Sequence, residues 1–190
     1  MKTCYFFLLG ALLTYSQFTF AQASKTLDSL TTYLKIHAPV DTTYVRVMDK
    51  AIFELMYRKA DYARADSLSR QMGEVATRLN DWMKVAGSYR NRASISHLKA
   101  DYDQALVYFQ KTLETAEQHG LPPQTVYGAL CNLASGYDKL NHDEQVLQTA
   151  LRAIKLQEQH TLKPRYPIPH RLIGGALVRM GRKQQAIPYY

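Results

Sequence analysis

The sequence repeats itself about every forty residues, and this period constrains the fold more than any other feature. The segment Lys59-Ala60-Asp61-Tyr62 recurs unchanged as Lys99-Ala100-Asp101-Tyr102, 40 residues later. A small or aliphatic residue follows at spacings of 40, 41 and 40, at Ala65, Ala105, Val146 and Ala186. The turn position repeats in step, at Ala60, Ala100, Asn141 and Gly181. A fixed period of this length is typical of arrays in which each unit buries its apolar face against the next.

Each unit is predicted to contain two helices. Asp41, Asp61, Asp81 and Asp101 are spaced by twenty residues, and Asn141 falls on the same grid. Asp and Asn favour helix N-caps because their side chains accept hydrogen bonds from unpaired N–H groups of the first turn. We therefore expect helices of about 16–18 residues starting at these positions. The grid position at residue 121 has no Asp or Asn. There we expect Gly120 to end one helix and the segment 121–123, which contains two prolines, to start the next.

Apolar residues recur at helical spacing in residues 102–116 and 129–140, and no segment of the mature chain alternates convincingly with period two. Residues 27–37 form one further amphipathic pattern, ended by Ala38-Pro39. We expect this segment, within 22–40, to be a leading helix that covers the apolar face of the first unit.

The repeated residues resemble tetratricopeptide (TPR) repeats over about 46–190. The third unit matches best, with small residues where two helices would cross and bulky ones between them: Leu133, Ala134, Tyr137, Asn141, Val146, Ala150 and Ala153. Phe53 in a small slot, Ser69 in an aromatic slot and Arg92 in an aliphatic slot depart from the pattern. The resemblance implies an all-α, right-handed α-solenoid of antiparallel helix pairs. It implies units at 41–80, 81–120, 121–161 and an incomplete 162–190.

The first residues are typical of a secretory signal peptide. Lys2 precedes the uncharged apolar stretch 5–13, and Thr19 and Ala21 have the spacing of a cleavage site. We expect residues 1–21 to be removed after export to the periplasm; an uncleaved membrane anchor is the alternative. Cys131 would then be the one remaining cysteine, either buried or paired between chains.

The last predicted helix begins near Arg182 or Lys183 and reaches only Tyr190, which is short for the second helix of a unit. We expect the chain to be part of a longer protein or to have a frayed C-terminus; a natural stop is the alternative. An export signal, a leading helix and long units resemble the sensor region of bacterial signalling proteins. Such chains often continue into a histidine kinase or a DNA-binding regulator.

No arrangement of residues predicts catalysis, a cofactor or a metal site. The six histidines include no pair three or four residues apart. The carboxylate pairs at 101/103 and 143/144 lie where helices start, where the helix N-terminus favours them. Gly174-Gly175 lies within a helical pattern and does not form a phosphate loop. An enzyme built on a helical solenoid is the least favoured hypothesis.

The remaining candidate is a protein-binding surface. The resemblance implies that the first helix of each pair lines the inner face, where peptides or partner helices bind. By register it nominates Tyr57, Arg58, Arg90, Ser94, His97, Asp138, Lys139, Arg171 and Arg179. Ala51 and Glu54 occupy the slots where TPR domains that bind a terminal carboxylate carry their first Lys and Asn, so that function is not expected.

The formal charge of +8 comes largely from one end of the chain. Residues 22–149 contain 15 Lys or Arg and 15 Asp or Glu, whereas 150–190 contain 8 cations and Glu158 alone. We expect an acidic protein or peptide partner and no nucleic acid, with membrane contact only through the signal segment or a C-terminal continuation. The predicted function is a non-enzymatic interaction module, the sensing or scaffolding part of a signalling protein. A freestanding periplasmic scaffold is the alternative.

Overall fold

The computed structural model describes residues 26–39, 41–163 and 167–190. The predicted signal segment 1–21 lies outside these residues, as do the first residues of the predicted leading segment. Within the described ranges, no helix combines the length and the apolar character that crossing a bilayer requires.

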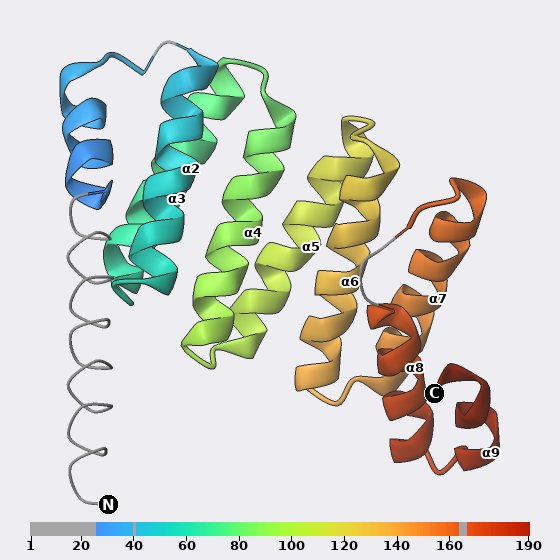
Figure 1. The fold of residues 1–190 in the computed structure, drawn as a ribbon. Coiled ribbons are helices and arrows are strands. Elements are labelled where there is room, and N and C mark those ends of the chain that lie inside the picture. The colour runs from blue at the N-terminus through green and yellow to red at the C-terminus, as the bar shows by residue number, and fades with distance from the viewer. Residues whose placement is uncertain (1–25, 40, 164–166) are drawn as a thin grey trace, which may run out of the picture.

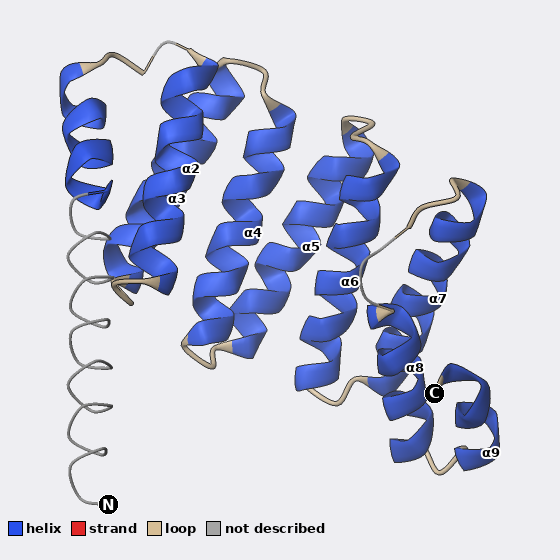
Figure 2. Ribbon diagram, viewed as in Figure 1, coloured by secondary structure: helices blue, strands red, loops and turns tan. Residues whose placement is uncertain are grey.

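The described chain is helical and contains no strand (Figures 1 and 2). A leading helix covers residues 26–36. It is followed by α2 (Thr42–Tyr57), α3 (Tyr62–Arg78), α4 (Trp82–Leu98), α5 (Tyr102–Gln118), α6 (Pro123–Lys139), α7 (Asp143–Gln159), α8 (Ile168–Arg179), α9 (Lys183–Ala186) and the 3₁₀ turn η1 (Ile187–Tyr189). Each helix from α2 to α8 packs mainly on its neighbours in sequence. The helices therefore form a solenoid of antiparallel pairs, which runs from blue to red in Figure 1.

One turn design joins the helices. A residue in the left-handed region ends each of α3 to α8 and the α2–α3 turn, with φ between 49° and 76°: Ala60, Asn80, Ala100, Gly120, Asn141, Thr161 and Gly181. The next N–H donates back to a carbonyl of the preceding helix, as from Asp61 to Leu55 at 2.9 Å and from Asp101 to Ser96 at 2.9 Å. This pattern satisfies carbonyls that the helix end would leave unpaired. The repeated turn therefore reflects a repeated backbone requirement.

The four aspartates of the twenty-residue grid are N-caps, as predicted. The carboxylates of Asp41, Asp61, Asp81 and Asp101 each accept a hydrogen bond from the N–H three residues later. The prediction of Asn141 as an N-cap was wrong, because His142 is the N-cap of α7. Its prediction as a turn position is confirmed, because Asn141 is the left-handed turn residue. The third unit is one residue longer, which moves its cap off the grid.

The fourth unit has shorter helices than predicted. α8 contains 12 residues instead of about 17, because Pro167 is its N-cap and Pro169 lies in its first turn. α9 starts at Lys183, as expected, and gives way after 4 residues to the 3₁₀ turn that contains Pro188. Ring atoms of Tyr190 lie against Gly174, where an added Cβ would be 2.9 Å from the ring. That glycine is needed for the close approach.

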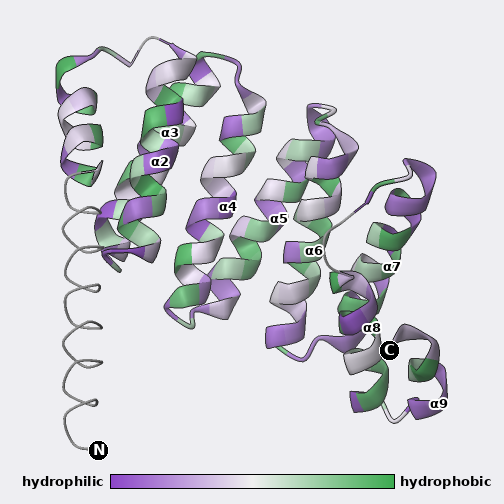
Figure 3. Ribbon diagram, in the orientation of Figure 1, coloured by the Kyte–Doolittle hydropathy of each residue, from purple (hydrophilic) through white to green (hydrophobic). Residues whose placement is uncertain are grey.

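The apolar core runs along the solenoid in three successive clusters. Figure 3 shows hydrophobic and hydrophilic residues interspersed along the helices that enclose it. Leu27 of the leading helix is 6% exposed, and Leu30 and Leu34 pack against the first cluster. The hydroxyl of Tyr44 also donates to the carbonyl of Leu34 at 3.2 Å, so the leading helix is tied to the first pair.

The three departures from the repeat pattern are accommodated in different ways. Ser69 is buried and donates its hydroxyl to the carbonyl of Ala65 at 2.7 Å. Arg92 pairs with Asp66 at 2.9 Å, and its guanidinium lies 4.3 Å from the centre of the Tyr108 ring. Phe53 is not packed at a close helix crossing; it is 52% exposed. Phe53 therefore contributes exposed apolar surface to α2 instead of core packing.

Candidate functional site

A groove crosses the first helices of three successive pairs, α2, α4 and α6. Two adjoining cavities of about 530 and 250 Å³ form it, and both are lined by Tyr57, Ser94 and Asn132. Only Phe109, from α5, comes from the second helix of a pair. The groove therefore lies on the face that the repeat register predicts as the inner one.

Aromatic and aliphatic side chains cover the middle of this groove. The rings of Phe53 and Tyr57 lie 4.9 Å apart at an angle of 48°, and both side chains are more than half exposed. Leu98 lines the same groove and is 45% exposed. Exposed apolar groups gathered in a concavity favour binding of a partner's apolar side chains, because binding removes both surfaces from water.

One wall of the groove is held by a polar network around Asp49. Its carboxylate accepts hydrogen bonds from Lys84 at 2.6 Å and from the amide of Asn91 at 3.2 Å. These contacts join α2 to α4 and fix the Asn91 side chain, whose carbonyl oxygen makes no side-chain hydrogen bond within the described chain. The network pre-organises the groove, which reduces the entropy lost on binding.

The groove carries more unpaired positive than negative charge. Lys50 and Arg90 are exposed, line the larger cavity and form no ion pair with another described residue. The one carboxylate in the lining, Asp49, is already paired with Lys84. Partial burial, and then the charge of Lys139, lower the pKa of His97 below its ordinary value. His97 is therefore held in its neutral form at neutral pH.

Two polar residues recur at equivalent positions in the first helices of successive pairs. Asn91 and Asn132 are 41 residues apart, as are Ser94 and Ser135, and all four line the groove. The hydroxyls of Ser94 and Ser135 donate to carbonyls one turn earlier, at 3.0 and 2.8 Å. The asparagines can both donate and accept hydrogen bonds. The solenoid therefore presents one polar ladder across two units.

Only some of the nine residues predicted as a binding surface line the groove. Tyr57, Arg90, Ser94 and His97 lie together in the groove. Arg58, at the C-cap of α2, pairs with Glu54 at 3.3 Å and does not line it.

The other four predicted residues, on α6 and α8, do not line the groove either. Arg179 joins three helices, because its guanidinium pairs with Asp138 of α6 at 2.6 Å and with Asp143 of α7 at 2.7 Å. These carboxylates raise the pKa of Arg179, with the hydrogen bond to Asp143 the largest cause. Lys139 and Arg171 are exposed and form no ion pair with another described residue. Arg179 thus has a role inside the array.

Sequence reasoning missed nine residues of the groove: Asp49, Met56, Leu98, Phe109, Lys50, Phe53, Asn91, Asn132 and Ser135. A signal for the last three was present, because Asn91 and Asn132, like Ser94 and Ser135, are equivalent in the repeat register. Phe53 does not recur in the repeat register, because the equivalent positions hold Ala93 and Ala134, and both of these are buried.

The described residues contain no group of three or more His, Cys, Asp or Glu side chains placed to hold a metal ion. Cys131 is buried as an unpaired thiol, which confirms the first of its two predicted states. Burial raises its pKa to about 11, which keeps it protonated and unreactive.

Comparison with models of protein families finds no match, and comparison with curated proteins finds none. Solved structures do resemble this one. BtubC (BKLC) from P. vanneervenii aligns with a TM-score of 0.71 at 18% identity, over 90% of this chain and 70% of that one. A structure from Podosopora anserina, of nearly identical TPR-like repeats in a protein assigned as a kinesin light chain, aligns with a TM-score of 0.68 at 12% sequence identity. The alignment covers 89% of this chain and 84% of that one. The predicted all-α, right-handed, TPR-like solenoid is therefore confirmed as the fold.

Proposed function

We propose that this TPR-like solenoid is a non-enzymatic protein-interaction module that binds an extended peptide segment of a partner in the groove over α2, α4 and α6. The observation that carries the proposal is the recurrence of Asn91 with Asn132 and of Ser94 with Ser135 along one groove. An extended peptide presents backbone N–H and C=O groups at regular intervals, and a carboxamide can pair with both kinds.

The apolar and cationic groups of the groove suggest which peptides would fit. Phe53 and Tyr57 offer a surface for a bulky apolar side chain, while Lys50 and Arg90 favour acidic residues beside it. Peptide side chains would provide selectivity, and the asparagines would hold the backbone whatever its sequence. An acidic partner agrees with the charge balance of the groove and adds an electrostatic contribution to the association rate.

Selection from a random peptide library displayed on phage tests this proposal. Peptides selected on the wild-type chain should bind Asn132→Ala about fivefold more weakly, because one net hydrogen bond is worth about 1 kcal/mol. Asn132→Arg should weaken binding further by filling the groove. Lys155→Ala, at an exposed position of α7, is the matched control and should bind as the wild type does. Selected peptides that bind Asn132→Arg with unchanged affinity would refute the assignment of the groove.

We further propose that the module acts outside the cytoplasm, as the sensing or scaffolding part of a signalling protein. The support is in the sequence, where Lys2 and the apolar stretch 5–13 are typical of an export signal. Fusion of residues 1–30 to a phosphatase that is active only in the periplasm tests the location. Phosphatase activity is expected with the natural segment and should be lost with Leu8→Arg; activity equal in both fusions would contradict export.

A further inference from the structure

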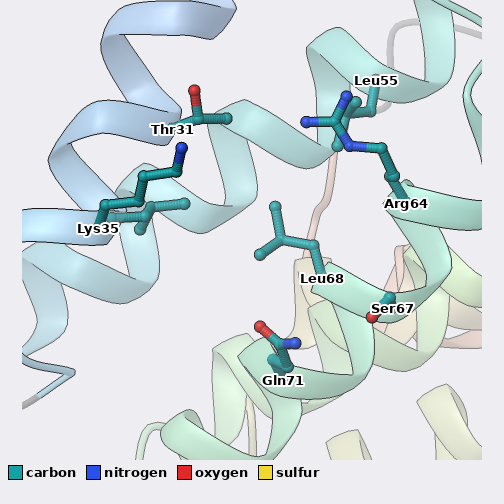
Figure 4. A pocket seen from close by; sticks show the side chains of 8 residues that line it. Thr31, Lys35, Leu55, Arg64, Ser67, Leu68 and Gln71 are labelled. Atoms are coloured by element: carbon teal, nitrogen blue, oxygen red, sulfur yellow. The ribbon is translucent and has the colours of Figure 1, made fainter.

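A second cavity lies at the N-terminal end of the solenoid, apart from the groove. The leading helix, α2 and α3 line this open cavity, and its volume is about 310 Å³ (Figure 4). None of its lining residues lines the groove, so a ligand could occupy it independently. Its volume is at the lower end of the range for small-molecule sites.

The floor of this cavity is aliphatic. Leu34, Leu55 and Leu68 line it from three different helices, and Leu55 is only 2% exposed. In Figure 4 the Leu68 side chain points into the space between the leading helix and α3. A short hydrocarbon chain placed here would lose contact with water on several sides, which favours binding by about 0.8 kcal/mol per buried methylene, or about fourfold.

Two cations stand across the cavity from each other. Figure 4 shows Lys35 on the leading helix and Arg64 on α3 directing their charged groups toward the same opening. Lys35 forms no ion pair or hydrogen bond with another described side chain. Arg64 makes a 3.6 Å contact to Asp61, but that carboxylate also serves as the N-cap of α3. No carboxylate belongs to the described lining, so an anion placed between the cations would be attracted by both.

Hydroxyl and amide groups complete the rim. Thr31, Ser67 and Gln71 line the cavity beside the two cations, and each can donate a hydrogen bond to an anionic oxygen. We propose that this cavity binds a small carboxylate with a short aliphatic chain. The chain would lie on the three leucines, and the carboxylate would lie between Lys35 and Arg64. This inference does not rest on the proposed peptide groove.

Isothermal titration calorimetry of the full chain with octanoate tests the proposal. We expect binding at one site, with a Kd of about 1 mM or tighter, that weakens as salt is added. Lys35→Gln and Arg64→Gln should each weaken binding about threefold, and the double variant about tenfold, as expected for partly exposed charge pairs. Lys155→Gln, at an exposed position of α7 that lines neither this cavity nor the groove, is the matched control and should leave the affinity unchanged.

Two further probes separate the contributions of the charge and the chain. Octanol, which lacks the charge, and acetate, which lacks the chain, should each bind at least about tenfold more weakly than octanoate. Far-UV circular dichroism establishes that the variants remain folded. The proposal is overturned if octanoate shows no saturation at about 10 mM, if the double variant binds it as the wild type does, or if octanol or acetate binds equally well.

Discussion

Charge reversal of Arg179 should destabilise the C-terminal end of the solenoid, whereas the same change at Arg171 should not. Both residues lie on α8, and both were nominated by register for the binding surface. Arg179 lies 2.6 Å from Asp138 and 2.7 Å from Asp143, which ties α8 to α6 and α7. Arg171 is exposed and forms no ion pair with another described residue. The two variants therefore change net charge equally and change internal contacts very differently.

The expected magnitude follows from this geometry. The carboxylates of Asp138 and Asp143 are 21% and 15% exposed, so their pairs with Arg179 are less screened than surface pairs but remain wet. We assign each pair about 0.5–1 kcal/mol, which gives about 1–2 kcal/mol for Arg179→Gln. Arg179→Glu adds repulsion from two nearby carboxylates, at about 1 kcal/mol each, for a total of about 3–4 kcal/mol. Arg171→Glu should remain within about 0.5 kcal/mol of the wild type.

Hydrogen exchange of the amides in α8 is the most direct assay, because a repeat array can open at one end while the rest stays folded. Protection in α8 should fall in Arg179→Glu and stay at the wild-type level in Arg171→Glu. The difference in protection between the two variants should shrink in about 0.5 M salt. Urea unfolding followed by circular dichroism provides the second measurement. Equal protection of α8 in the two variants would refute the reasoning. The comparison also separates loss of partner binding caused by charge from loss caused by local unfolding.

Three further predictions concern turns, caps and pH. Ala60→Gly should stabilise the chain by about 0.5–1 kcal/mol in urea unfolding, because Ala60 has a φ of 51°, whereas Ala63→Gly, within α3, should destabilise it by about 1 kcal/mol. Asp101→Ala should cost about 1 kcal/mol in the same assay, because it removes an N-cap hydrogen bond, and Asp101→Asn should retain most of the stability. Burial lowers the pKa of His97, so the unfolded chain binds a proton at this residue more readily than the folded chain does. The free energy of unfolding should therefore be highest above about pH 6.5 and should fall as pH decreases, and His97→Gln should reduce this dependence. An unchanged pH dependence in that variant would contradict the assignment.

The helices and turns could be predicted because their signals are local. An aspartate that accepts a hydrogen bond from the N–H three residues on needs no distant partner, so the grid at Asp41, Asp61, Asp81 and Asp101 predicted four helix starts. The N-cap prediction for Asn141 failed because asparagine suits two local roles, the N-cap and the left-handed turn residue. The inserted residue of the third unit decided between them.

The groove was harder to predict, because its composition depends on contacts between units. Phe53 stands at the register position of Ala93, yet Ala93 is buried whereas Phe53 is exposed beside Tyr57. The register places equivalent backbone positions on equivalent faces, but it does not state which neighbouring side chains cover them. The surroundings of the first pair include the leading helix, which packs on the first apolar cluster through Leu27, Leu30 and Leu34.

The cations predicted for the inner face show the same limit and indicate how the binding proposal should be tested. Arg90 and Arg171 are 81 residues apart, the sum of two unit lengths, and both are exposed without an ion pair to another described residue. Arg179 stands in register with Lys139, but Asp138 and Asp143 engage it within the array. A side chain held by two carboxylates cannot offer its full charge to a partner without breaking those contacts. Charge reversal at Arg90, which lines the groove, therefore tests capture of an acidic partner, whereas charge reversal at Arg179 tests the integrity of the solenoid.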